Sequence, residues 1–344
     1  MDELTSRQKE ILICIIECHI ETKLPVGSRM LAERYWLNLS PASVRHEMGV
    51  LEDIGLLTHP HTSAGRIPTD KGYRFYVREV AKEPVSQALA RLISQELERK
   101  IESLESLMEH ASRILSAMAE EAVVLTAPEL RKLYFKELNL MLLASNRLLV
   151  VWCSTSGLIQ NCAVEMDSPI SREELNRIHS FINRELRGIP IEDLEKELLG
   201  RIESRRDSLR QVYEQALRII QSSIPFLAMP RVFVEGSRYI LGQPEFRDVK
   251  KFQPLIATLE EKISLIGLLR SRSLGPGVHV AIGEEELSKE IWDCALVSAP
   301  YLWHGKCVGT LGILGPRRMP YGRIMGLVHQ MSGEMSQVLE RWGS

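Results

Sequence analysis

Hydrophobic residues recur at helical spacing through the first part of the chain, in three short segments separated by breaks. These segments predict helices over residues 5–22, 29–35 and 41–54. Thr5-Ser-Arg-Gln8 has the form of a capping box at the start of the first helix. Ser40 suits the N-cap of the third helix, with Pro41 at its first position and Gly55 at its end.

The pattern changes after the third helix. Residues 56–69 contain two short apolar runs that flank a loop rich in Pro, Ser and Gly, which predicts two strands. Thr69 can cap a fourth helix that carries several aromatic residues. Three helices followed by a strand, a loop and a strand is the order of a winged helix-turn-helix.

A long helical pattern follows, from about residue 83 to 124. Its apolar positions form a near-heptad stripe: Leu89, Leu92, Ile93, Leu97, Ile101, Leu104, Leu107 and Met108. This stripe has two interpretations, packing against the same chain or a seam between two copies in a dimer.

Strand-like runs begin after Pro128 and return near the C-terminus. They cover residues 138–144, 148–152, 158–164, 231–235, 239–241, 278–282, 295–299 and 308–314. Helical patterns fill residues 171–224, 253–269 and 321–342. A strand meander that resumes after a helical interval indicates one α+β domain with another inserted into it.

Composition favours a soluble multidomain protein. The 344 residues exceed one typical domain, and 44% are hydrophobic while 26% are charged. The net charge is −2, so any surface for nucleic acid must be a local patch. Residues 23–78 carry eight basic and five acidic side chains, a net charge of +3, whereas residues 1–22 have a net charge of −3. The positive segment contains the third helix and the expected wing.

Several classes of chemistry find no support in the residues. The six cysteines lack a Cys-x-x-Cys pair and are expected to be reduced thiols of a cytosolic protein. No signal peptide or membrane span is predicted. His46, His59 and His61 lack the Cys or carboxylate partners of a metal site, so no metal, cofactor or catalytic residue is assigned. The Gly309-x-x-Gly312 run is not a dinucleotide fingerprint, and we expect the protein not to be an enzyme.

The third helix has the chemistry of a DNA-reading element. With Val44, Met48 and Leu51 turned inward, its outer side carries Ala42 and His46. Its first turn is small, which allows it to enter a major groove roughly 12 Å wide, and its free N–H groups can bind a phosphate. The alternative is an ordinary surface helix with a Ser-Pro cap.

The candidate DNA-binding residues share a polar or small side chain in the second to fourth helices and the wing. They are Ser28, Arg29, Ser40, Ala42, Ser43, Arg45, His46, Arg66, Lys71 and Arg74. Arg45 is expected at a guanine edge or a phosphate. Arg66 is expected at the wing tip, where it enters a minor groove or meets a phosphate; the alternative is a solvated turn.

Ordered motifs in this region closely resemble those of the HrcA family of heat-inducible transcription repressors. They are Pro25-Val-Gly-Ser28, Asn38-Leu-Ser-Pro-Ala-Ser-Val-Arg45, Glu47-Met48, Leu51-Glu52, Gly55-Leu-Leu57 and His61-Thr-Ser-Ala-Gly-Arg-Ile-Pro-Thr-Asp-Lys-Gly-Tyr-Arg74. The resemblance returns in Pro244-Glu-Phe246, Ile282-Gly283 and Gly312-Ile-Leu-Gly-Pro-Arg-Arg-Met-Pro-Tyr321, so it covers essentially the whole chain. His46 stands where the family usually has Asn, which alters the groups available for base recognition.

The resemblance implies an α+β multidomain protein: an N-terminal winged helix-turn-helix and a GAF-like α+β domain with an inserted, mainly helical dimerisation domain. The boundaries that we expect are 1–80 for the winged helix, 81–125 for a helical linker leading into the GAF-like domain, 126–170 and 275–344 for the GAF-like domain, and 171–274 for the insertion.

The resemblance also implies a function and partners. A cytoplasmic homodimer is expected to bind double-stranded DNA at an inverted repeat, the CIRCE operator, ahead of chaperone genes. The GroE chaperonin is expected to promote the active form, so that heat stress relieves repression. The alternative is a winged-helix regulator that senses a small molecule through its GAF-like domain.

Overall fold

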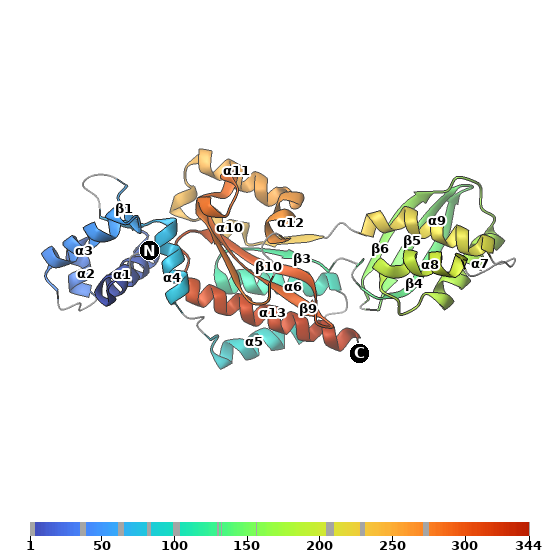
Figure 1. The fold of residues 1–344 in the computed structure, drawn as a ribbon, viewed down its shortest axis with the longest axis horizontal. Helices are drawn as coiled ribbons and strands as arrows, with labels where there is room; N and C mark the ends of the chain where they lie inside the picture. The colour runs from blue at the N-terminus through green and yellow to red at the C-terminus, as the bar shows by residue number, and fades with distance from the viewer. Residues whose placement is uncertain are drawn as a thin grey trace.

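The chain forms three units arranged in a row (Figure 1). The computed structural model describes residues 4–34, 39–60, 65–80, 84–98, 104–128, 131, 133–155, 157–203, 210–227, 231–270 and 275–343. The winged-helix domain lies at one end, a central domain in the middle, and a unit inserted into the central domain at the other end.

The winged-helix domain has the predicted order of elements. They are α1 (Ser6–Thr22), α2 (Ser28–Arg34), α3 (Pro41–Asp53), β1 (Leu57–Thr58), β2 (Ile67–Pro68) and α4 (Asp70–Glu79). The capping box at Thr5 and Gln8 and the side-chain cap at Thr69 are both formed. Gly55 follows α3 with a φ of 78°, a left-handed conformation that favours glycine. The sequence prediction of these helices is confirmed.

The central domain contains one antiparallel sheet with strand order β7-β3-β10-β9-β8. Its strands are β3 (Ala122–Thr126), β7 (Val232–Glu235), β8 (His279–Ile282), β9 (Cys294–Trp303) and β10 (Lys306–Pro316). Side chains on both faces of β3 are buried, because helices cover both faces.

One face of this sheet is covered by α5 (Gln87–Glu98), α6 (Leu104–Ala119) and α13 (Tyr321–Gly343), and the other by α10 (Ser237–Leu241), α11 (Val249–Glu260) and α12 (Lys262–Arg270) (Figure 1). Three short 3-10 helices complete it: Pro244–Phe246, Gly283–Glu285 and Lys289–Ile291. In the described part of the apolar stripe, Ile93, Leu97 and Leu107 are buried beside α13. Leu92 is 45% exposed, and Ile101 lies outside the described residues. Of the two interpretations of the stripe, packing against the same chain is the one observed.

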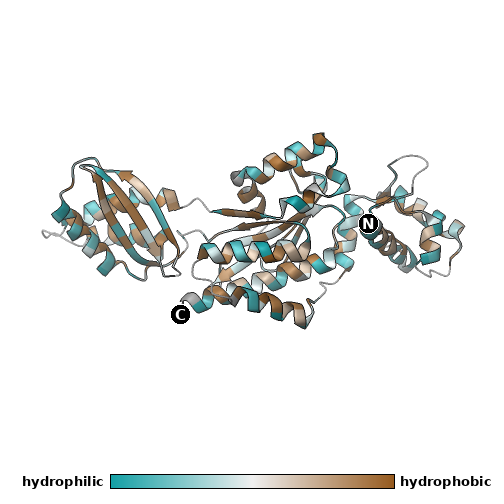
Figure 2. Ribbon diagram, turned by 180° about the vertical axis from the view of Figure 1, so that it is seen from behind, coloured by the Kyte–Doolittle hydropathy of each residue, from teal (hydrophilic) through white to brown (hydrophobic). Residues whose placement is uncertain are grey.

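The inserted unit has a three-stranded antiparallel sheet of its own, in the order β4-β5-β6. It consists of β4 (Phe135–Ala144), β5 (Arg147–Ser154), β6 (Ile159–Glu165), α7 (Arg172–Glu185), a 3-10 helix (Ile191–Asp193), α8 (Leu194–Glu203) and α9 (Arg210–Leu227). Helices α7 and α9 pack on one face of the sheet, which buries Leu138, Val150 and Trp152. Figure 2 shows the other face in front, with the helices behind it.

The structure corrects the expected domain boundaries. Residues 138–164 were expected in the same sheet as the C-terminal strands, but they belong to the inserted unit. Residues 231–270 were expected in the insertion, but β7 pairs with β3 and α10 to α12 cover the central sheet. The segment 81–125 is no linker, since α5, α6 and β3 are part of the central core. Side-chain alternation predicts a strand but does not identify its partner strand.

Within the described ranges, no helix combines the length and apolar character that crossing a membrane requires. The same part of the chain contains no cluster of three or more His, Cys, Asp or Glu side chains arranged to hold a metal ion.

Candidate nucleic-acid interface

The first turn of α3 is small and open to solvent, as its sequence predicts. The Ser40 hydroxyl accepts a hydrogen bond from the Ser43 backbone N–H at 3.1 Å, and Pro41 occupies the first turn. Ser40, Pro41, Ala42 and Ser43 are all exposed. This end of the helix therefore presents N–H groups and the positive end of the helix dipole without bulky side chains in front of them.

The body of α3 is divided between an inner and an outer side. Val44, Met48 and Leu51 are buried in the core of the winged helix. Arg45 and His46 are exposed on the outer side, and neither forms an ion pair in the part of the chain that the structure describes. A long cation and an imidazole are therefore free to reach base edges or phosphates beside the small tip.

Helix α2 packs against α3 and contributes its first two residues to the same region. Ser28 is half-buried at the start of α2, whereas Arg29 is exposed. In helix-turn-helix proteins the helix that precedes the reading helix crosses the DNA backbone. The positions of Ser28 and Arg29 suit contacts with phosphates rather than bases.

Arg66 lies at the base of the wing rather than at its tip. Its backbone exchanges hydrogen bonds with Val26 at 2.8 and 2.9 Å, which joins β2 to the turn before α2. Gly65 is required beside it, because a Cβ there would lie 2.4 Å from the Val26 carbonyl oxygen. The expected tip, including His61, falls on residues 61–64, which lie outside the described residues.

The side chain of Arg66 is already paired. Its Nη2 lies 2.7 Å from Oε2 of Glu52, near the C-terminus of α3, and His59 contacts the other oxygen of the same carboxylate. The Arg66 Nε is buried and has no hydrogen-bond partner among the residues that the structure describes. Contact with DNA would therefore require a phosphate to compete with Glu52 for this guanidinium.

Arg74 was expected on the DNA surface, but the structure places it in the contact with the central domain. Its Nη1 donates to the Val280 carbonyl at 2.7 Å, and its Nη2 pairs with Glu286. Lys71, in the first turn of α4, is exposed. Of the two α4 residues expected at DNA, Lys71 is available to a phosphate and Arg74 is not.

The remaining contacts of α4 fix the winged helix on the central domain. Asp70 accepts a hydrogen bond from the Glu284 backbone N–H at 3.0 Å and pairs with Arg317. The rings of Tyr73 and Tyr76 lie 6.0 and 6.5 Å from that of Tyr321, at edge-type or tilted angles. Sequence reasoning missed these positioning residues, because their partners lie more than 200 positions away along the chain.

Comparison with known proteins decides the family. The model for the "Winged helix-turn-helix transcription repressor, HrcA DNA-binding" domain matches residues 3–81, and the model for the "HrcA protein C terminal domain" matches residues 105–325. The chain belongs to the HrcA family. The C-terminal family model spans the central sheet together with the inserted unit, so the insertion is part of the family's domain rather than an addition of this chain.

Full-length relatives support the same assignment. A protein of Symbiobacterium thermophilum, described as "Heat-inducible transcription repressor HrcA", is 34% identical over 336 residues, covering 97% of this chain and 98% of the relative. One of Natranaerobius thermophilus with the same description is 36% identical over 341 residues, covering 98% of each.

The crystal structure of a hypothetical protein is similar to this chain, with a TM-score of 0.67, 24% identity, and coverage of 99% of this chain and 100% of the other. At this identity the similarity shows that the two proteins share the overall fold. The exposed first turn of α3 falls inside the matched DNA-binding domain of the HrcA family.

Proposed function

We propose that this protein is a transcriptional repressor that binds the major groove of an inverted-repeat operator with α3. The observation that carries the proposal is the exposed, small first turn of α3 beside the free side chains of Arg45 and His46. A groove of roughly 12 Å admits a helix only if its leading end is slim. The family match on residues 3–81 supports DNA as the partner.

An inverted repeat is read by two copies of the protein, because a two-fold site presents the same half-site twice. The inserted unit offers a surface for a second copy. On the face of its sheet opposite the helices, Met141 and Ile159 are 57% and 56% exposed, and register places Leu149 beside Met141. An apolar sheet face of this kind supports a homodimer formed through the inserted unit.

The family resemblance supports the finer features of the proposal. The operator is of the CIRCE type, ahead of heat-shock chaperone genes, and heat stress relieves repression. The GroE chaperonin sustains the active form. Since the DNA partner is the genome, the site of action is the cytoplasm.

The test is footprinting and gel-shift titration on DNA upstream of the host's chaperone genes, with and without chaperonin. The full-length protein should protect an inverted repeat. Arg45→Ala should weaken binding by at least ~1 kcal/mol, because it removes one base or phosphate contact. Arg187→Ala, which removes an exposed cation of the inserted unit, is the control and should leave affinity unchanged. Equal affinity of wild type and Arg45→Ala would contradict the assignment of α3.

The alternative function, a winged-helix regulator that senses a small molecule, has one observation in its favour. The central domain contains a cavity of about 460 Å³ between α6 and α10, with two arginines in its lining. This cavity is compatible with repression through α3, because ligand and DNA would occupy different domains.

A further inference from the structure

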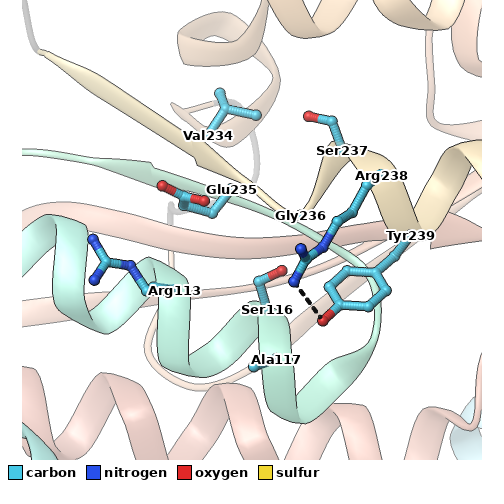
Figure 3. A pocket seen from close by; sticks show the side chains of 9 residues that line it. All are labelled: Arg113, Ser116, Ala117, Val234, Glu235, Gly236, Ser237, Arg238 and Tyr239. Atoms are coloured by element: carbon cyan, nitrogen blue, oxygen red, sulfur yellow. Dashed lines mark hydrogen bonds between the residues drawn. The ribbon is translucent and has the colours of Figure 1, made fainter.

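The cavity of the central domain opens where α6 meets the end of β7. Its lining is Arg113, Ser116, Ala117, Val234, Glu235, Gly236, Ser237, Arg238 and Tyr239. Figure 3 shows the Arg238 guanidinium turned back over Gly236 toward Ser116, whereas Arg113 and Glu235 lie at the opposite end. The volume of about 460 Å³ falls within the range of small-molecule sites.

The cavity lining has a net positive charge, because Arg113 and Arg238 face the single acid Glu235. Arg113 and Arg238 form no ion pair in the described part of the chain, whereas Arg231, Arg317 and Arg318 of the same domain are each paired with a carboxylate. Arg238 instead donates to the Tyr239 hydroxyl at 3.3 Å and lies 5.0 Å from the centre of its ring. The guanidinium is thus oriented by a neutral group, which leaves its charge for a ligand.

A second hydrogen-bond donor lies beside Arg238. Because the Tyr239 oxygen accepts from Arg238, the Tyr239 proton stays available to a ligand. The Ser237 hydroxyl points away from this pair (Figure 3). Gly236, with a φ of 77°, lies directly over Ser116, since a Cβ there would be 1.9 Å from the Ser116 Oγ. Only glycine fits at this position, so α6 packs directly against the turn that leads into α10 and carries Arg238 and Tyr239.

The edge strand β7 adds backbone groups to the wall. The Arg231 carbonyl accepts from the Ala127 N–H at 2.7 Å, and the β3 register continues this pairing through Phe233 and Glu235. In an antiparallel pair, alternate residues face the partner strand, so the N–H and C=O of Val234 point away from β3. Strand β7 is the edge of the sheet among the described strands, so these groups have no strand beside them.

We propose that this cavity binds a small organic anion with one negative group, a carboxylate or a phosphate monoester. The negative group lies against Arg238 and Tyr239, and the apolar body of the ligand lies along Val234 and Ala117. Glu235 repels a second negative group elsewhere in the ligand. Glu235 and Arg113 carry opposite charges and together have no net charge. An uncharged hydrogen-bonding group at the ligand's far end can therefore lie between them.

The cavity is connected to the winged helix. Helix α10 leads into Gln243, whose side-chain oxygen accepts from Arg318 at 2.6 Å and from Lys23, the C-cap residue of α1, at 3.5 Å. Gln243 also donates to Glu121 at 3.5 Å, and the Glu121 carbonyl accepts from Ser116 of the cavity at 2.9 Å. A ligand that shifts α10 would therefore change the contacts of α1, a consequence that rests on the proposed DNA-reading function.

The binding test uses the full-length protein and four probes: butyrate, butyramide, butylamine and methyl phosphate, titrated at constant ionic strength. Butyrate, butyramide and butylamine have nearly the same size and differ in charge. Ligand-observed NMR and thermal denaturation should show saturable binding of butyrate or methyl phosphate in the roughly millimolar range expected for small fragments. Butyramide and butylamine should not saturate. Which anion binds more tightly distinguishes a carboxylate from a phosphate ligand.

Variants locate the site. Arg238→Gln should weaken anion binding about tenfold, because it removes the charged donor, and Tyr239→Phe should weaken it less. Arg187→Gln, an equal charge change on the inserted unit, should bind as wild type does. Arg238 is exposed, and an unchanged melting temperature without ligand confirms that its variant folds. Equal binding by Arg238→Gln and wild type, or equal binding of butyrate and butyramide, overturns the proposal.

A separate measurement tests the connection. Saturating anion should change operator affinity in the wild type and leave it unchanged in Arg238→Gln. If the wild type binds anion but no operator, the proposed repressor function fails while the anion site stands. If it binds operator but no anion, the anion site fails while the repressor function stands.

Discussion

The carboxylate of Asp70 lies 2.8 Å from the guanidinium of Arg317, Oδ1 to Nη1, and joins the winged-helix domain to the central domain. The Asp70 side chain is 13% exposed, so its charge is only partly screened by water. The other oxygen of Asp70 accepts from the Glu284 N–H, and Gly283 approaches so closely that a Cβ there would collide with the carboxylate. Asp70 thus helps to hold the winged-helix domain on the central domain, together with Arg74, Tyr73 and Tyr76.

Asp70→Asn should loosen this junction, because it removes the charge that faces Arg317. Hydrogen exchange of the peptide that contains the Glu284 amide should become about fivefold faster. This factor corresponds to a loss of about 1 kcal/mol, the amount expected when the hydrogen bond from the Glu284 N–H loses its charged acceptor at a partly exposed site. Asp53→Asn, an equal change at an exposed position of α3, is the control. Unchanged exchange at Glu284 in Asp70→Asn would mean that other contacts hold the domains together.

The pair of Glu52 and Arg66 gives a second prediction. Because Glu52 holds the Arg66 guanidinium at 2.7 Å, a DNA phosphate must displace it. Glu52→Gln should therefore strengthen operator binding by about 0.5–1 kcal/mol and steepen its salt dependence, whereas Arg66→Ala should weaken binding and flatten that dependence. Gel-shift titrations over a range of salt concentrations measure both effects.

Glu33→Gln is the matched control for Glu52→Gln, since Glu33 is an exposed acid on α2 of the same domain. If both variants strengthen binding equally, net charge alone explains the effect. In that case Arg66 has no specific part in DNA binding.

Glu121 makes the stability of the central domain depend on pH. Burial raises the pKa of its carboxyl from 4.5 to about 8, and the nearby Arg318 lowers it by less than burial raises it. The side chain is 5% exposed, and within the described segments its Oε2 has no hydrogen-bond partner. Between pH 4.5 and 8 the folded protein holds a proton that the unfolded chain releases, so stability falls as pH rises through this window.

Glu121→Gln should remove this dependence, because the amide stays neutral. The variant should gain stability over the wild type as pH rises from 5 to 8.5, by an amount on the order of a few kcal/mol. Thermal or urea denaturation at several pH values measures the difference. Glu120→Gln, at the exposed neighbouring position, should keep the wild-type slope. Parallel pH profiles for wild type and Glu121→Gln would contradict the assignment.

The sequence predicts local structure well where the interaction is short in range. The spacing of Val44, Met48 and Leu51 identifies the buried side of α3, and Ser40 marks its start, because both signals lie within a few residues of one another. Arg74 shows the limit of this reasoning. Its charge and position resemble those of a DNA contact, but its partner Glu286 is 212 residues away along the chain.

The same limit applies to the sheets. Alternating side chains at residues 138–164 predict strands correctly, but β4 to β6 form a sheet apart from β3 and β7 to β10. Strand pairing is decided by which apolar faces the folded chain buries together, and no periodicity records it. The cavity between α6 and α10 was not predicted from the sequence either, since Arg113 and Arg238 are far apart in the chain and come together where β7 pairs with β3.

The uncovered sheet face of the inserted unit gives the last prediction. Met141→Asp and Ile159→Asp place charges on a face that the proposed dimer buries, so light scattering should show a shift from dimer to monomer. Leu143→Asp, at a site that is 54% exposed beside a β-bulge of the same sheet, tests how far the interface extends. Each variant should remain folded and unfold cooperatively as a monomer, because the substituted side chains are exposed in the single chain.

Monomeric variants should still bind a single half-site with the intrinsic affinity of α3. They should lose most of the affinity for the complete inverted repeat, because the second half-site no longer binds at the effective concentration that the partner provides. Lys196→Asp, an exposed position on α8 and thus on the helical side of the unit, is the control and should remain dimeric. Dimeric Met141→Asp and Ile159→Asp proteins with full operator affinity would place the dimer contact on another surface.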